Sequence, residues 1–584
     1  MRRAGSLSLP FFNYCFLDIE TIVRTVVHSR KGGARMQGMH VPPQTAQRPG
    51  GGFAYKWIVA WVVVIGVFMS ILDTTIVNIA IPRLQTAFGV DLHSVQFVST
   101  AYLLTLGVVT PTTAFFADRF GIKRYYITSL LAFTLGSALC GLAWSLPVLV
   151  FFRILQGLGG AALFPLSLSL LFQEFPPGER GLAMGVFGIP ALLGPALGPT
   201  LGGYIVTFAD WQLIFYINVP VGIVAIILAV LLLRERQAER RPSFDVVGFI
   251  FSAIGLASVL YAFTEVSLDG WGSTTVLGFL GGGLVALALF VAVELIIARR
   301  GGEPLLDLRV FASRLYTMST IAYVLAVFSL FGGLFLLPIY LQNLRGLSAF
   351  QAGLVLLPQA FASAVSVLVG GRLVDRIGVR AVVIPGLLIL GLASWQLSFL
   401  TLFSPYWWLQ IMFVLRGLSL GLVAQPLIVS MMAEIRPQQL TQASSISTVT
   451  RSVAGSFGIA ILATLVQRQT QVHYAYLAEQ VTASSPLGQL VPRLQALFTA
   501  RGASIDAART AALQVIARLV QRQGYDLAMQ DAFQLTVVIV ALAVIVTLFV
   551  RGRRRPARTP EQPTSTRVPA RAEEETRAAS TSGV

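Results

Sequence analysis

The sequence predicts an all-α protein that crosses a membrane many times. Of its 584 residues, 55% are hydrophobic and only 12% are charged, whereas soluble domains carry about 25% charged residues. The mean hydropathy is +0.74. About fourteen separate apolar runs are long enough to span a bilayer. This composition excludes a soluble globular enzyme and a disordered chain.

The apolar runs define the predicted helices in order. A bilayer core about 30 Å thick requires roughly 20 mostly apolar residues per spanning helix. Glycine and proline within several runs are acceptable because neighbouring helices satisfy the freed backbone groups. The predicted spans are 57–80, 94–116, 125–146, 147–172, 181–206, 213–233, 245–264, 274–298, 316–338, 349–370, 381–402, 407–430, 441–466 and 532–550.

The basic residues predict the orientation of these helices. The chain holds 43 Lys and Arg against 26 Asp and Glu, a formal net charge of +17. If the first span leaves the cytoplasm, sixteen Lys and Arg lie in the even-numbered connections, and only Arg83 and Arg345 lie in the short odd-numbered ones. Because cytoplasmic loops are enriched in Lys and Arg, both termini are predicted to be cytoplasmic. The basic excess therefore indicates membrane topology, and nucleic-acid binding is the weaker interpretation.

Two segments interrupt or precede the apolar runs. Residues 1–55 are expected to form an N-terminal cytoplasmic segment, in which Met36 or Met39 is an alternative start. Residues 467–529 are expected to form a long external connection that contains an amphipathic helix near 505–523.

A repeated loop predicts two related halves. The loop after span two reads AFFADRFGIKR, and the loop after span ten reads GRLVDRIGVR. Their aspartates, Asp118 and Asp375, are 257 residues apart, which exceeds the length of six spans by about the length of two more. Transporters built from parallel repeats bind their substrate near the membrane midplane between the halves. The predicted units are a six-helix bundle at 56–233, two inserted helices with linkers at 234–313, a second six-helix bundle at 314–550 and a disordered cytoplasmic tail at 551–584.

The motif DRFGIKR and its second copy resemble the conserved loop of the major facilitator superfamily. The fourteen-span layout resembles the drug:proton antiporter branch of that family, the EmrB/QacA type, over roughly residues 55–550. The resemblance implies the major facilitator fold and a plasma-membrane protein that exchanges a small-molecule substrate for protons. It implies no cofactor and a monomer in the lipid bilayer.

Two charged residues within apolar spans are candidates for proton coupling and for binding substrate charge. Asp73, in LDTTIVNIAIP, resembles the first-helix motif of the family, and a charge there is costly unless it is paired, hydrated or protonated. The alternative is a hydrated aspartate near the external end. Arg153, in FRILQGLGGAALFP, cannot lose its proton. The resemblance implies that Arg153 assists proton transfer, and the alternative is a topological anchor. In the second half Arg416 aligns with Gln156 when the glycines are matched.

Span five carries the most specific pattern. Small residues at four-residue spacing let helices approach closely, and proline removes a backbone donor. The full spacing resembles the motif that marks exporters among major facilitators, and implies a bent helix that packs between the halves and limits leak. Its residues are Gly185, Gly194, Gly198, Pro199, Gly202 and Gly203.

The remaining candidates are gating loops and a substrate pocket. The resemblance implies that the paired loops latch one access state, with Asp118 as the leading residue; the alternative is a solvated turn. The gating residues are Asp118, Arg119, Gly121, Arg124, Asp375, Arg376, Gly378 and Arg380. The candidate pocket residues are Tyr102, Gln156, Phe331, Phe335, Gln359 and Gln425.

The leading hypothesis for function is proton-coupled export of hydrophobic or cationic drugs or toxic small molecules by alternating access. The alternatives are a dedicated exporter of one metabolite or antibiotic and, opposed by the glycine motif, a solute:proton symporter. A membrane enzyme is not expected, because the chain shows no metal-ligand or nucleophile pattern at membrane depth. No nucleotide-binding loop is present, so ATP-driven transport is not expected either.

Overall fold

A computed structural model describes residues 55–90, 92–235, 243–482 and 484–550. Every regular element within these ranges is helical, which confirms the predicted all-α class. The expectations for the N-terminal segment up to residue 54 and for the tail at 551–584 lie outside the described residues.

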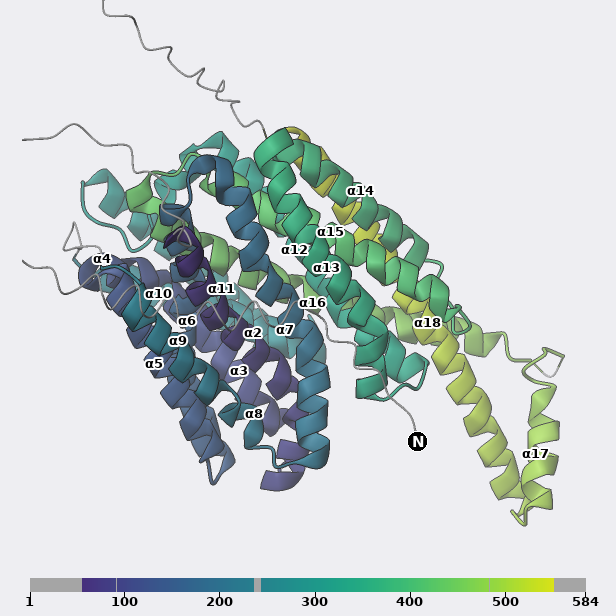
Figure 1. The fold of residues 1–584 in the computed structure, drawn as a ribbon. Coiled ribbons are helices and arrows are strands. Elements are labelled where there is room, and N and C mark those ends of the chain that lie inside the picture. The colour runs from purple at the N-terminus through teal and green to yellow at the C-terminus, as the bar shows by residue number, and fades with distance from the viewer. Residues whose placement is uncertain (1–54, 91, 236–242, 483, 551–584) are drawn as a thin grey trace, which may run out of the picture. The chain divides into compact units, whose positions relative to one another are not determined.

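The first half of the chain follows the first six predicted spans (Figure 1). Two spans are broken by short irregular turns. A 3₁₀ turn at Thr110–Thr112, which contains Pro111, separates two helices of the second span, and Ile217 separates two helices of the sixth. The helices are α2 (Tyr55–Phe88), α3 (Leu92–Val109), α4 (Thr113–Phe120), α5 (Ile122–Gly141), α6 (Leu146–Glu174), α7 (Arg180–Phe208), α8 (Leu213–Tyr216) and α9 (Asn218–Leu232).

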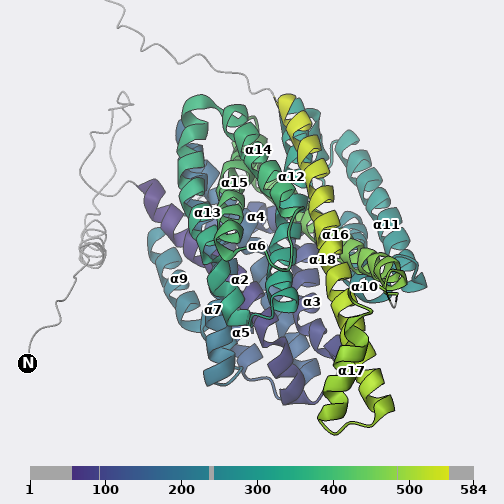
Figure 2. The same cartoon turned by 90° about the vertical axis from the view of Figure 1, so that its right-hand side faces the viewer.

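The inserted pair consists of α10 (Val246–Asp269) and α11 (Thr274–Arg299), which pack on each other. Figure 2 shows α11 beside α10 at the edge of the helical bundle. Leu277, Leu284 and Val285 of α11 are exposed apolar side chains. A helix that is apolar and exposed in this way suits contact with lipid.

The second half begins after a short 3₁₀ turn, η3 (Leu308–Ala312), and ends at residue 550. Its fifth helix follows another 3₁₀ turn, η5 (Pro437–Gln439). The helices are α12 (Arg314–Ile339), continued by the π-turn η4 (Tyr340–Leu344), then α13 (Ala349–Ile377), α14 (Val379–Leu397), α15 (Tyr406–Met432), α16 (Leu440–Glu479), α17 (Leu490–Ala500) and α18 (Ile505–Leu548).

The predicted connection at 467–529 is largely helical. Helix α16 continues to Glu479, beyond the predicted end of its span, and α18 runs without a break from Ile505 into the last span. The helix expected near 505–523 is therefore present, but as the first part of α18. The short helix α17 packs along α18 (Figure 1). We call α17 together with the first part of α18 the hairpin end.

Twelve helical segments of the described residues are long and apolar enough to cross a membrane. They do not include α5 and α7, which correspond to the predicted spans at 125–146 and 181–206. The multi-spanning architecture is thus confirmed, and the count of fourteen spans stays a prediction.

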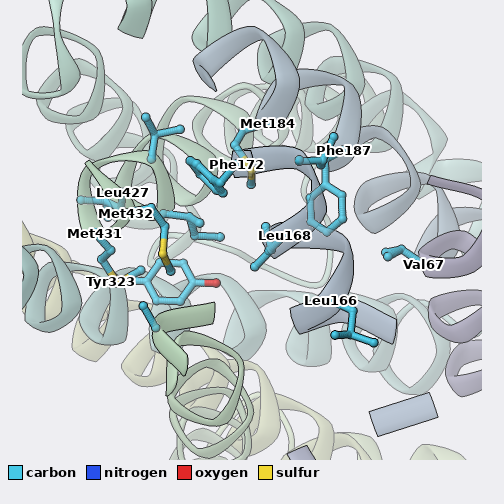
Figure 3. Packing of buried hydrophobic residues seen from close by; sticks show 14 of the residues in the cluster. Val67, Leu166, Leu168, Phe172, Met184, Phe187, Tyr323, Leu427, Met431 and Met432 are labelled. Carbon is cyan, nitrogen blue, oxygen red and sulfur yellow. The ribbon is translucent and has the colours of Figure 1, made fainter. Parts of the chain in front are cut away.

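The two halves contact each other through α7 and α13, and also through α6 and α16. The end of the molecule opposite the hairpin end holds the turns with Asp118 and Asp375, and we call it the charged-loop end. An apolar cluster with members from both halves fills the interior here. Figure 3 shows its members Leu168, Phe172, Met184 and Phe187 from α6 and α7, with Tyr323, Leu427, Met431 and Met432 from α12 and α15.

Candidate functional site

Asp73 lies at the centre of a buried polar cluster in the first half. Its side chain, on α2, has no solvent-exposed surface. One carboxylate oxygen accepts a hydrogen bond from Arg153 at 2.7 Å. The other accepts from Gln156 at 2.9 Å and from Asn218 at 2.9 Å. The carboxylate is therefore fully hydrogen-bonded and lies away from solvent, unlike the hydrated aspartate of the alternative hypothesis.

Arg153, on α6, is held from several directions. Besides its ion pair with Asp73, Nη1 donates to Gln156 Oε1 at 2.7 Å, and Nε donates to the carbonyl of Val98 at 3.1 Å. The guanidinium lies 4.1 Å from the centre of the Tyr102 ring. An arginine with this many acceptors and only 1% exposure is part of the helix packing, which argues against a surface anchor.

Asn218 is a member of the cluster that sequence reasoning missed. It is the first residue of α9, directly after the break at Ile217, and its Nδ2 group also lies 3.2 Å from Ser137 Oγ. The segment WQLIFYINVPVG held the signal, because Asn218 is a polar residue within the largely apolar run 213–222. Its place in the cluster depends on how the sixth span folds back on α2.

The cluster has a chemical property that suits a coupling site. Asp73 and Arg153 together carry no net charge, and the remaining members are neutral. Protonation of Asp73 would remove the attraction between the carboxylate and the guanidinium, while Arg153 would keep its bonds to Gln156 and Val98. A single proton therefore weakens the interaction between α2 and α6, and it leaves Arg153 as a buried cation whose hydrogen-bond acceptors are all neutral, which costs free energy.

The predicted exporter motif places α7 between two different partners. Near the charged-loop end, a Cβ atom added to Gly185 would come within 3.0 Å of the Val367 carbonyl oxygen on α13. Further along, Cβ atoms added to Gly194 and Gly198 would lie 2.6 Å from Ile71 and 2.3 Å from Thr75, both on α2.

The rest of the motif is less closely packed. A Cβ atom added to Gly202 would lie 2.9 Å from Ile76 of α2, whereas one at Gly203 would meet no atom within 4 Å. The side chain of Pro199 lies outside the described part of α7. The motif thus packs on the other half through Gly185, and on α2 of its own half through three of the later glycines.

The second predicted gating loop contacts α7 directly. Asp375, near the end of α13, accepts hydrogen bonds from the backbone N–H groups of Gly181 at 2.9 Å and Leu182 at 3.0 Å. A carboxylate at a helix N-terminus satisfies free N–H groups and is favoured by the helix dipole. Gly378 then ends α13 with a φ of +89°. Arg376 is exposed and Arg380 half-buried.

The first predicted gating loop has the same turn but different surroundings. Gly121 has a φ of +88°, and its N–H bonds to the carbonyl of Ala117. Arg119 is exposed, and Arg124 lies 3.4 Å from Glu235 in an exposed ion pair. Asp118 lines a cavity of about 760 Å³ with residues of η5 and of the linker after α11.

Asp307 joins that linker to the start of α16. It accepts hydrogen bonds from Arg309, at Nε and at the backbone, and from Gln439 of η5 at 3.0 Å. Burial by itself raises the pKa of Asp307, but the bonds from Arg309 and Gln439 outweigh this and lower it. Asp307 is therefore ionised at neutral pH and fixes the inserted segment to the second half.

The six predicted pocket residues do not form one group. Tyr102 and Gln156 are fully buried in the cluster around Asp73. Gln425, on α15, faces Gly188 of α7, and Phe331, on α12, faces Gly455 of α16. The other two members, Phe335 and Gln359, are half-buried and buried respectively.

Arg416 occupies the interior of the second half without an acidic partner among the described residues. Its Nη1 donates to Ser394 Oγ at 3.0 Å and its Nη2 to the Ser329 carbonyl at 3.2 Å. Its Nε has no hydrogen-bond partner. The second half therefore has a buried arginine, as the first half does, but no paired carboxylate.

Comparisons with known proteins agree with this architecture. Residues 63–459 match the family model described as Major Facilitator Superfamily. The chain is 32% identical over 533 residues to the Tetracenomycin C resistance and export protein of Streptomyces glaucescens, covering 89% of this chain and 96% of that protein. It is 32% identical over 450 residues to a Multidrug resistance protein B homolog of Mycobacterium tuberculosis, covering 76% of this chain and 81% of that protein. The human organic anion transporter MFSD10 shares the fold, with a TM-score of 0.53, 15% identity, and coverage of 85% of this chain and all of that chain.

Proposed function

Because the chain belongs to the major facilitator superfamily, we propose that it exports hydrophobic small molecules in exchange for protons, by alternating access. The names of the relatives support export of drugs or antibiotics. The proposal places the protein in the plasma membrane as a monomer, with the charged-loop end and both termini on the cytoplasmic side.

The observation that carries this proposal is the position of α7. Its first part packs on α13 of the other half, and its later glycines pack on α2 at Ile71 and Thr75, on either side of Asp73. Thr75 also donates a hydrogen bond to the carbonyl of Gly194 at 3.2 Å. A change in the hydrogen bonds of Asp73 that shifts α2 is therefore transmitted through α7 to the interface between the halves.

The proton cycle follows from the chemistry of the cluster. With Asp73 ionised, its bonds to Arg153, Gln156 and Asn218 fix α2 against α6 and α9. A proton on Asp73 weakens this attachment and permits α2 and α7 to shift together. The bond of Asp375 to the start of α7 stabilises the state in which the charged-loop end is closed.

A broad exporter and a dedicated exporter of one compound remain the two candidates for substrate range. The relatives include both kinds of name, a multidrug resistance protein and a tetracenomycin C export protein. Drug resistance of an efflux-deficient host that expresses this chain separates them: resistance to several unrelated drugs supports the broad exporter.

The coupling is tested by substrate-driven proton flux in proteoliposomes, with the wild type beside Asp73→Asn. We expect the variant to lose proton flux, because its amide cannot take up a proton. The matched control is Asp506→Asn, an exposed aspartate at the hairpin end, which is expected to behave as the wild type. Coupled flux at the wild-type level in Asp73→Asn contradicts the role of Asp73.

A further inference from the structure

Arg451 is a charged residue in the middle of a predicted membrane span that neither the fold nor the proton cycle explains. It lies on α16, ten residues into the span predicted at 441–466. The residue is half-buried. A charged side chain at this depth in the membrane is costly, and such residues usually face a binding site or a partner of opposite charge.

No acidic residue pairs with Arg451 in the described part of the chain. Its guanidinium lies 3.8 Å from the centre of the Phe164 ring on α6, and it interacts electrostatically with Tyr323 of α12. It makes no hydrogen bond and no ion pair to any described residue. Since α6 belongs to the first half and α12 and α16 to the second, this cation lies where the halves meet.

The buried acidic residues of the described chain form no ion pair with Arg451; they are Asp73, Glu265, Glu294, Asp307 and Asp526. Asp73 is already paired with Arg153, and Asp375 binds the start of α7. Arg416 is fully buried and held by Ser394 and Ser329, so it does not offer an accessible charge. Arg451 is thus a half-buried cation without an acidic partner among the described residues.

The surroundings of Arg451 are aromatic. Phe164 lies 5.1 Å, ring to ring, from Phe187 of α7. Phe187 and Tyr323 are both buried members of the apolar cluster shown in Figure 3, and Phe164 packs against that cluster. A planar guanidinium binds carboxylates through two parallel hydrogen bonds, and aromatic rings beside it favour an aromatic ligand.

We infer that Arg451 binds the negatively charged group of an aromatic substrate, a carboxylate or a phenolate. This inference rests on the proposed export function and names the charge of its cargo. It differs from the cationic cargo that the sequence suggested, because the carboxylate expected to bind a cation is already occupied by Arg153.

Equilibrium binding to the purified full-length protein tests this inference without requiring transport or proton coupling. Two xanthene dyes of opposite charge serve as probes: fluorescein is anionic, and rhodamine 6G is cationic. Fluorescence polarisation is measured for the wild type, Arg451→Gln, Arg451→Lys and the control Arg468→Gln. Arg468 is an exposed arginine on the same helix.

The wild type is expected to bind fluorescein more tightly than rhodamine 6G. Arg451→Gln should weaken fluorescein binding on the order of tenfold and leave rhodamine 6G binding unchanged or stronger. Arg451→Lys should keep most of the preference, and Arg468→Gln all of it. A wild type without a preference for fluorescein, or an unchanged preference in Arg451→Gln, overturns the inference. If the wild type shows no substrate-driven proton flux in proteoliposomes, that result counts against the coupling proposal alone, because dye binding does not depend on proton flux.

Discussion

Replacing Arg153 by glutamine should destabilise the protein more than the same replacement of Arg416. Both arginines are 1% exposed, but only Arg153 has a carboxylate partner. In Arg153→Gln, Asp73 would keep its two amide donors, Gln156 and Asn218, and lose its only cationic one. Breaking a buried ion pair by removing one partner costs about 3–5 kcal/mol, because the remaining charge is buried without compensation.

Arg416→Gln should change the stability little, because a loss and a gain offset each other. The variant loses the two hydrogen bonds that Arg416 donates to Ser394 Oγ and to the Ser329 carbonyl, each worth about 1 kcal/mol. It also removes a buried charge that has no counter-ion among the described residues. We therefore expect a change of about 1 kcal/mol or less, of either sign.

The assay is thermal unfolding in detergent micelles, followed by tryptophan fluorescence. The variants are Arg153→Gln, Asp73→Asn, the double replacement and Arg416→Gln. The double replacement should be more stable than Arg153→Gln alone, because it leaves no unpaired charge. If the loss in the double variant equals the sum of the two single losses, the residues do not interact and the reasoning is refuted.

Three further predictions test other parts of the mechanism. Gly198→Ala should lower the melting temperature and drug efflux, because its Cβ would lie 2.3 Å from Thr75, a steric conflict worth about 1–3 kcal/mol, whereas Gly203→Ala should change neither. Asp375→Asn should weaken closure of the charged-loop end, since a carboxylate at a helix N-terminus contributes about 0.3–1 kcal/mol; distances between spin labels on the ends of α7 and α13 should become longer and broader, and an unchanged distribution counts against the latch. The pKa of Asp307 is lowered in the folded protein, so ionised Asp307 stabilises the fold above the ordinary carboxyl pKa of about 3.9, and this stabilisation is lost as pH falls through the lowered pKa. The difference in melting temperature between the wild type and Asp307→Asn should therefore shrink below about pH 4. A difference that does not depend on pH would contradict the lowered pKa of Asp307.

The sequence was sufficient for features that depend on local pattern. Apolar runs predict helices because length and hydropathy alone decide whether a segment can span a bilayer. The DRxG turns were equally readable, since Gly121 and Gly378 both take the positive φ that glycine favours. Asp73 and Arg153 stood out as charges in apolar surroundings, and the structure brings them into contact.

Features that depend on packing between distant helices could not be read in the same way. Asn218 joins the cluster only because α9 packs on α2, and nothing near it in the sequence specifies that contact. Tyr102 resembled a pocket aromatic, but its ring lies against Arg153. Likewise, the glycines of α7 indicate close packing, while their two different partners follow only from the tertiary structure.

The internal repeat relates the surroundings of Arg153 in the first half to those of Arg416 in the second. A Cβ atom added to Gly157 would meet the backbone oxygen of Tyr102, and one added to Gly417 would meet that of Gln359. Tyr102 and Gln359 are 257 residues apart, the same offset as Asp118 and Asp375. We infer that these contacts are equivalent, which supports the alignment of Arg416 with Gln156.

On α12, Arg416 donates to the Ser329 carbonyl and lies against Gly333, where an added Cβ atom would lie 1.6 Å from its guanidinium. The second half thus has a buried cation opposite an apolar residue, where the first half has a carboxylate bound by an amide and a guanidinium. Only the first arrangement can take up and release a proton near its cation, because arginine stays charged. If the proposed exchange operates, the Asp73 cluster is therefore the part of the molecule in which a proton changes the attraction to a buried arginine, and the second half contributes to transport by moving against the first.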